Sequence, residues 1–194
     1  MQNEKIYKHY VFLDRFNKIV ESNLLKFSNI IIIIDINQND NKSLKEQSLI
    51  IDFLKKYKIP FLIKNDYQKC QKYKADGIFI ESINKKNIRP ILLKKKFKII
   101  GGAHNQLEYY QKYRQNCSVL MLSPLFENKK YTSNKILNIL RFNIKSLHWN
   151  IKLCALGGIN SNTIKKVKLT KCIATSFKSF IFDPKIKKPA HNLM

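Results

Sequence analysis

Short apolar runs alternate with longer amphipathic segments along this chain of 194 residues. Runs this short and this uniformly apolar are typical of strands that are buried on both faces, as in a parallel sheet. We predict eight such strands, at Tyr10–Leu13, Ile30–Ile36, Pro60–Ile63, Gly77–Ile80, Phe97–Ile100, Val119–Leu122, Leu153–Leu156 and Cys172–Thr175.

Segments whose apolar residues have the spacing of a helix separate these strands. Residues 44–57 place Leu49, Ile50, Phe53 and Leu54 on one stripe, with lysines outside it. Similar patterns occur at 88–95, 106–113, 136–149 and 162–169. Eight strands with intervening helices predict a small (β/α)8 TIM barrel with short loops, and a doubly wound open sheet is the alternative. We expect one barrel domain over residues 1–182 and a loose basic tail over residues 183–194.

The formal net charge of +24 raises the question of nucleic-acid binding. Lysine supplies nearly all of it, however, since arginine occurs only at Arg15, Arg89, Arg114 and Arg141. Lysine, isoleucine and asparagine, all with A/T-rich codons, dominate the composition, and the lysines are spread along the chain. We therefore expect no nucleic-acid partner and favour small phosphorylated molecules.

Neither a signal peptide nor a membrane span is indicated. The N-terminus has no long apolar core, and the run Ile30–Ile34 is too short to cross a bilayer. The four cysteines, Cys70, Cys117, Cys154 and Cys172, form no C-x-x-C pair or zinc spacing. We expect reduced thiols in or near the core of a cytoplasmic protein with no membrane partner.

Two adjacent glycines, Gly157 and Gly158, follow the seventh predicted strand. Such a pair allows a tight turn whose following amides point at an anion on a helix N-terminus. Further motifs accompany it in a fixed order: Asn65-Asp66, Ala75-Asp76-Gly77-Ile78-Phe79-Ile80, His104-Asn105 and Ser123-Pro124-Leu125-Phe126. Together they resemble the thiamine-phosphate synthase and thiazole tautomerase superfamily, a set of small (β/α)8 barrels, over most of the chain.

The resemblance implies an enzyme of thiamine biosynthesis that joins hydroxymethylpyrimidine diphosphate to thiazole phosphate and releases pyrophosphate. Because the departing diphosphate needs its charge neutralised, we expect Mg²⁺ at the site. The matching positions imply Asp66 and Asn84 as metal ligands. They imply Asn65 as a catalytic residue that bonds the pyrimidine or a phosphate oxygen. The family's loop lysine aligns with Tyr131 when no gap is allowed, and a shift of the loop would bring Lys129 and Lys130 to that position as the catalytic residues that hold pyrophosphate.

The thiazole phosphate would bind after the seventh and eighth strands, where barrels of this kind often hold a phosphate. The resemblance assigns Gly157, Gly158 and Ser179 to that site, with Ser123 and His104 as further binding residues. Each candidate also has a structural interpretation. Asp66 and Ser179 could cap helices, the glycines could only permit a turn, the two lysines could lie in a solvated loop, and His104 could start a helix.

Several residues depart from the family pattern. The family's second strand ends in Gln-Leu-Arg-Glu-Lys, and here residues 33–37 contain an acid, Asp35, and no cation. We interpret Asp35 as a strand-end residue paired with a nearby lysine. Pro124 replaces the histidine of the tautomerase branch, which argues against tautomerase activity. Three functions stay open: a divergent synthase, a barrel that binds thiamine phosphate or thiazole phosphate without catalysis, or a basic protein that binds nucleic acid or an acidic partner. A homodimer also stays open.

Overall fold

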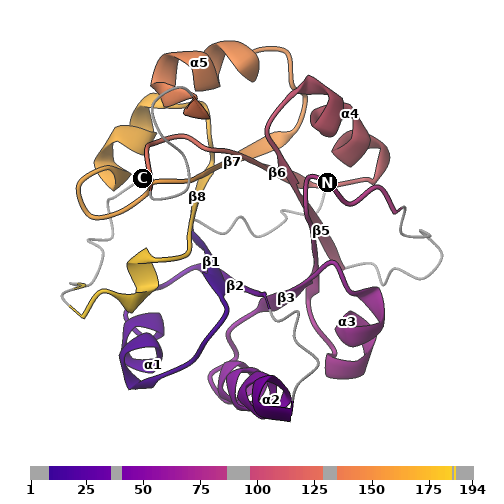
Figure 1. Ribbon diagram of the computed structural model, residues 1–194, viewed down its shortest axis with the longest axis vertical. Coiled ribbons are helices and arrows are strands. Elements are labelled where there is room, and N and C mark those ends of the chain that lie inside the picture. The colour runs from indigo at the N-terminus through magenta and orange to yellow at the C-terminus, as the bar shows by residue number, and fades with distance from the viewer. Residues whose placement is uncertain (1–8, 36–40, 87–96, 129–134, 185, 187–194) are drawn as a thin grey trace.

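The computed structural model describes residues 9–35, 41–86, 97–128, 135–184 and 186. Eight parallel strands form a closed barrel in sequence order, with helices outside it (Figure 1). The (β/α)8 prediction is confirmed, and the open sheet is excluded because β8 pairs with β1 from His9↔Thr175 to Val11↔Phe177. The elements are β1 His9–Leu13, α1 Lys18–Leu24, β2 Ile30–Ile34, α2 Asn41–Lys56, β3 Phe61–Lys64, α3 Tyr67–Tyr73, β4 Gly77–Ile80, β5 Lys98–Ala103, α4 Gln106–Arg114, β6 Val119–Leu122, α5 Asn138–Lys145, β7 Lys152–Leu156, the 3-10 helix η3 Ile164–Leu169, β8 Ala174–Phe177 and the 3-10 helix η4 Phe180–Phe182.

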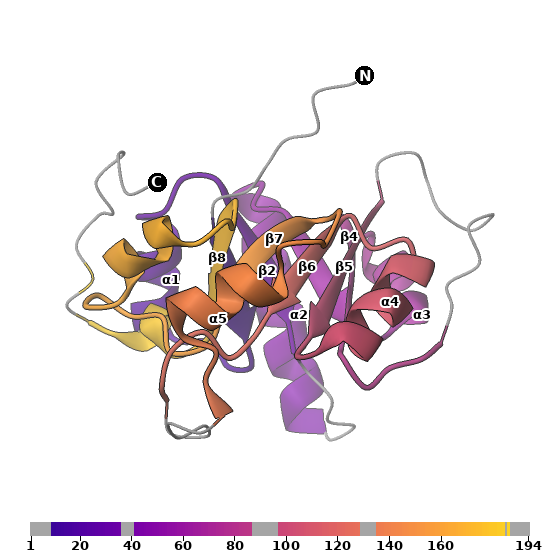
Figure 2. The same cartoon turned by 90° about the horizontal axis from the view of Figure 1, so that it is seen from above.

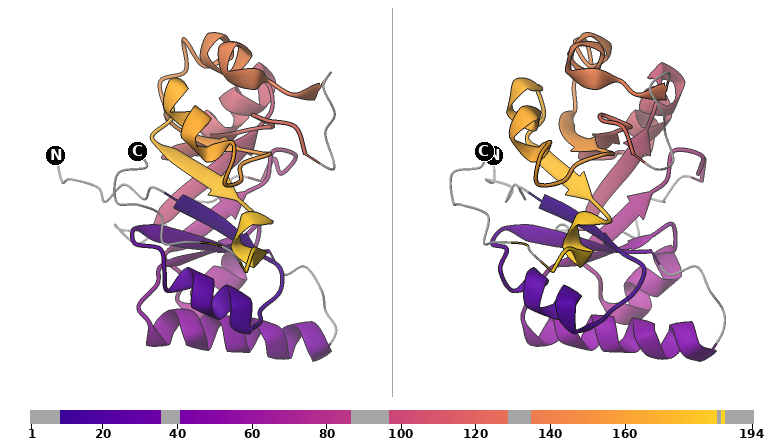
Figure 3. Two further views of the ribbon diagram at one scale, coloured as in Figure 1. Left: turned by 90° about the vertical axis from the view of Figure 1, so that its left-hand side faces the viewer. Right: turned by 60° about the vertical axis from the view of Figure 1, so that its left-hand side comes forward.

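The helices cover the barrel on opposite sides. In the view of Figure 2, α5 lies in front of the strands and α2 lies behind them. Figure 3 shows the strands between α1 and α2 below and α5 above. The strands are thus enclosed by helices on their outer face, which is why they lack the polar alternation of a half-exposed sheet.

Alternate residues of each strand belong to two separate hydrophobic cores. The inner core fills the barrel with side chains from the strands: Tyr10, Phe12, Ile31, Ile33, Leu62, Phe79, Ile100, Val119, Met121, Cys154 and Ala174. The outer core joins the opposite strand positions to the helices and includes Val11, Ile32 and Ile63 together with Leu54 and Phe142. The period of two residues per strand therefore decides which side chains point toward the barrel axis.

Several predicted boundaries need correction. β8 begins at Ala174 and not at Cys172, α5 is shorter than the predicted 136–149, and residues 164–169 form a 3-10 helix. Leu49 is 62% exposed, so it does not share the buried stripe of α2. The predicted helix at 88–95 falls wholly within residues 87–96, outside the described ranges.

β5 continues through two glycines that its sequence pattern did not include. A Cβ atom on Gly101 would lie 2.9 Å from the Sγ of Cys117 and from two carbons of the Lys112 side chain. Glycine is therefore required at this position because α4 approaches the strand closely.

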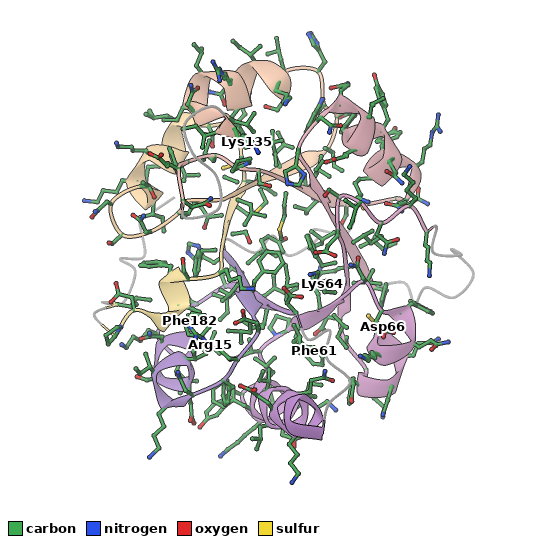
Figure 4. The ribbon with its side chains drawn as sticks, viewed as in Figure 1. Arg15, Phe61, Lys64, Asp66, Lys135 and Phe182 are labelled. Carbon is green, nitrogen blue, oxygen red and sulfur yellow. The ribbon has the colours of Figure 1, made fainter. Side chains whose placement is uncertain are left out.

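The expected loose tail is attached to the barrel at its start. The side-chain amide of Asn23 donates to the carbonyls of Ile181 and Asp183, both at 2.9 Å, and Ile186 is buried. The guanidinium of Arg15 also lies 4.3 Å from the ring centroid of Phe182, and Figure 4 shows the two residues together beside α1. These contacts hold residues 181–183 against α1.

All four cysteines are free, as predicted. Cys70, Cys117 and Cys154 are buried, and burial raises the pKa of Cys70 and of Cys117 to about 12. Within the described residues, no helix is both long enough and apolar enough to cross a bilayer.

We expect the native thiols to react slowly with Ellman's reagent at pH 8, because burial keeps them protonated. Less than one equivalent should react within minutes in native protein, and four after unfolding in guanidinium. Rapid reaction of two or more thiols in native protein would contradict this burial.

Since the folded pKa of Cys70 lies above its ordinary value of 9.0, the free energy of unfolding should fall as the pH rises above that value.

Candidate active site at the carboxyl end of the barrel

Charged side chains gather where the strands of the barrel end. Asp14, Asp35, Lys64 and Glu81 each lie two residues beyond an inner-core side chain of β1, β2, β3 and β4. The parallel register sets Phe12 beside Ile33 and Ile33 beside Leu62. The residues two positions further along each of these strands therefore lie at the same height along the barrel axis. Because strand residues point inward with period two, these polar groups meet at the mouth of the barrel.

Ion pairs and hydrogen bonds join these groups and their neighbours into one cluster, which we call the mouth network: Asp14, Asp35, Lys64, Asn65, Glu81, Asn84 and Lys178. The Nζ atom of Lys64 lies 2.8 Å from Oδ1 of Asp35 and 2.6 Å from Oε1 of Glu81. Lys178 lies 2.8 Å from Asp14 and 3.7 Å from Asp35. The expectation that Asp35 pairs with a nearby lysine is thus confirmed.

Lys64 is the central cation of this network. Figure 4 shows it toward the middle of the ring of strands, and its side chain is only 12% exposed. Burial by itself would lower the pKa of Lys64, but the hydrogen bonds and charges of Asp35 and Glu81 outweigh it, so the pKa is raised. Lys64 is therefore a firmly protonated ammonium group at neutral pH.

Asn65 connects the network to the loop after β4. It adopts a left-handed backbone conformation with φ 56°, which asparagine tolerates well. Its side-chain amide donates to Glu81 at 2.6 Å, while its oxygen accepts from the Glu81 backbone at 2.9 Å and from the Asn84 amide at 3.0 Å. The structure thus brings two predicted site residues, Asn65 and Asn84, together.

A buried lysine of α4 holds that loop in place. Lys112 is fully buried and donates to the carbonyl of Asn84 at 2.8 Å and to the side chain of Gln115 at 2.9 Å. Gln115 in turn donates to the carbonyls of Asn84 and Lys86. Burial lowers the pKa of Lys112, so its role here is to anchor the backbone.

The residues predicted to bind Mg²⁺ each accept a local backbone hydrogen bond. Oδ1 of Asp66 accepts from the backbone of Lys69 at 2.9 Å as the N-cap of α3, and Figure 4 shows Asp66 beside that helix. The side-chain oxygen of Asn84 accepts from the backbone of Lys86 at 2.9 Å. Among the described residues, no three His, Cys, Asp or Glu side chains are grouped to hold a metal. One carboxylate oxygen of Asp66 thus serves as a helix cap, and the assignment of Asp66 and Asn84 to Mg²⁺ stays a prediction.

The glycine pair shapes the loop after β7. Both residues have positive φ, 98° for Gly157 and 68° for Gly158. A Cβ atom on Gly158 would lie 2.5 Å from the carbonyl oxygen of Glu127, and the Gly157 carbonyl accepts from the backbone of Phe126 at 3.0 Å. Close contact with the loop after β6 therefore requires glycine here with or without a phosphate.

The other predicted binding residues have varied surroundings. Ser179 follows β8, next to β7 in the sheet, and makes no side-chain cap bond to η4. His104 lies two residues before α4, whose N-cap is Asn105. Its ring Nδ1 is 3.0 Å from Glu108 of that helix. Ser123 is buried and donates its backbone N–H to Ala103. Lys129 and Lys130 lie outside the described residues.

Four residues of the mouth network were not identified as site residues from the sequence: Asp14, Lys64, Glu81 and Lys178. The available signal was the strand period, since Lys64 and Glu81 each stand two positions after an inward apolar residue. Ser176 also points inward, and its buried hydroxyl has no hydrogen-bond partner among the described residues. The family motifs drew attention to Asp66, whose side chain turns out to cap a helix.

Comparison with known proteins agrees with this architecture. The family profile described as "Thiamine monophosphate synthase" matches residues 6–179. The chain belongs to this family. The match covers every strand of the barrel and the mouth network, so the family resemblance inferred from the motifs is confirmed.

Individual relatives of the thiamine monophosphate synthase family are distant. A thiamine-phosphate synthase of Staphylococcus haemolyticus is 26% identical over 129 residues, which are 63% of this chain and 60% of that protein. One of Prochlorococcus marinus is 30% identical over 134 residues, 66% of this chain and 38% of that protein. The chain thus spans between about a third and three fifths of the relatives it matches.

Solved structures share the fold. The thiamine phosphate pyrophosphorylase of Pyrococcus furiosus has a TM-score of 0.72 at 15% identity, over 93% of this chain and 90% of that one. A 2-keto-3-deoxy-6-phospho-gluconate aldolase of Zymomonas mobilis has a TM-score of 0.61 at 8% identity, over 90% and 83%. Since the aldolase is nearly as similar, these structures establish the barrel and leave the reaction to the site.

Two substitutions at Asp66 separate helix capping from charge. Asp66→Ala should lower the free energy of unfolding by about 1 kcal/mol, because the N-cap acceptor is lost. Asp66→Asn should retain nearly all of it, because asparagine caps as well as aspartate. Thermal unfolding measures both, with an expected shift of about 2–4 °C for the alanine variant. Equal destabilisation by the two variants would show that the charge of Asp66, and not its cap, is what matters.

Gly158→Ala should destabilise the protein by about 2–4 kcal/mol, because a Cβ atom there meets backbone at a positive φ. Gly102→Ala is the matched control. Its Cβ would meet the ring of Phe79 at 3.2 Å with no positive φ, so we expect a loss of about 1 kcal/mol or less. Denaturant unfolding compares them, and equal losses would refute the close approach of the loop after β6 to Gly158.

Proposed function

We propose that this protein is a thiamine-phosphate synthase, which joins hydroxymethylpyrimidine diphosphate to thiazole phosphate and releases pyrophosphate. The observation that carries the proposal is the family match over residues 6–179, which takes in the whole barrel and its mouth. Its small-molecule substrates and cytoplasmic location belong to the proposal. A homodimer and the lack of a nucleic-acid partner stay predictions.

The reaction makes a clear electrostatic demand. The carbon–oxygen bond of the pyrimidine diphosphate breaks, and its electron pair leaves with pyrophosphate. The thiazole nitrogen supplies the pair for the new carbon–nitrogen bond, so no net proton is transferred. Stabilising the leaving group therefore requires fixed positive charge more than a general acid or base.

The chain's residues fit this demand in two places. Lys64 presents a fixed, protonated ammonium at the barrel mouth, and Lys178 adds a second beside β1 and β8. The Gly157–Gly158 turn and Ser179 follow the adjacent strands β7 and β8, the usual place for a substrate phosphate in such barrels. We assign the diphosphate to the lysines and the thiazole phosphate to the loops after β7 and β8.

The test is direct turnover. Purified protein is mixed with both substrates and Mg²⁺, and in parallel with a chelator, and thiamine phosphate is measured. We expect product above the no-enzyme control, and a loss of about 10²-fold or more in kcat/KM for Lys64→Met, as for removal of one stabilising charge. Lys55→Met on α2 is the matched control and should leave turnover unchanged. Folded protein that binds thiamine phosphate without forming it would favour the non-catalytic barrel.

A further inference from the structure

The contact between Asp35, Lys64 and Glu81 has the form of an ion-binding site. Two carboxylate oxygens, from the ends of β2 and β4, lie within 2.8 Å of one nitrogen supplied by β3. The side chains of Asp35 and Glu81 are 18% and 34% exposed, so water screens their charges only in part. Without a cation between them, these two carboxylates would repel each other across the barrel mouth.

The surrounding groups keep this arrangement fixed. The second oxygen of Glu81 accepts from Asn65 at 2.6 Å, and the second oxygen of Asp35 lies 3.7 Å from Lys178. Each carboxylate is thus held on both of its oxygens. An ammonium has three donors, and the carboxylates engage Lys64 from two sides, which leaves a donor available to a ligand at the mouth.

The residues nominated for a metal ion do not share this arrangement. Asp66 caps α3 and Asn84 accepts from Lys86, so neither points an oxygen at the convergence of Asp35 and Glu81. In the part of the chain that the structure describes, the position between converging carboxylates at the mouth is held by an ammonium.

We propose that the Lys64 ammonium fills the cation position between Asp35 and Glu81, so that the protein carries this positive charge itself and binds no metal between these two carboxylates. Only the role of this charge, which is to stabilise the departing pyrophosphate, rests on the proposed function. The absence of a metal between these carboxylates is a property of the protein alone and can be tested without turnover.

Manganese binding provides that test, because the electron paramagnetic resonance signal of free Mn²⁺ reports how much is bound. We expect wild-type protein to bind no Mn²⁺ at the mouth. Lys64→Met removes the ammonium while keeping the length of the side chain, and should bind Mn²⁺ at least tenfold more tightly than wild type. Adding Asp35→Asn to this variant should abolish the gain, because one converging carboxylate is lost.

Lys69→Met is the matched control. Lys69 pairs with a single carboxylate, Asp66, at 3.8 Å, so its loss changes the net charge equally without opening a two-carboxylate site. An equal gain in Lys69→Met, or no gain in a Lys64→Met protein that unfolds cooperatively, would overturn the proposal. Should Lys64→Met not fold, the wild-type titration decides: Mn²⁺ binding that Glu81→Gln or Asp35→Asn removes overturns the proposal, and no binding supports it.

Discussion

Closure of the sheet by hydrogen bonds between β8 and β1 is the constraint on which the rest of this structure depends. Once the sheet is a closed cylinder, alternate residues of every strand must point either to its axis or to the helices. Apolar side chains fill both layers as far as the strand ends. Beyond that level the inward positions reach water, and the charged residues of the mouth network occupy them.

The mouth network gathers charged groups from neighbouring strands. Asp35, an acid, follows β2. Lys64 on the neighbouring strand approaches that acid to 2.8 Å, and Glu81 on the next strand completes the cluster. Because adjacent parallel strands end at one edge, charges carried by different strands meet in the same region of the mouth.

Local pattern was a good guide where a single strand or helix start decided the outcome. The apolar runs at Gly77–Ile80 and Val119–Leu122 form strands with the predicted bounds. The pattern failed where a neighbouring element intervened. β5 runs through Gly101 because α4 packs against it, and β8 starts later than predicted, at Ala174.

The sequence by itself determined the order of strands and helices and the family, because each depends on local composition or ordered motifs. Only the tertiary structure decided which polar residues meet. Asp66 became a helix cap, whereas Lys64, Asp35 and Glu81 converged from three strands. Residues separated along the chain come together through register and closure, and these arise from pairing across the whole barrel, which no single segment encodes.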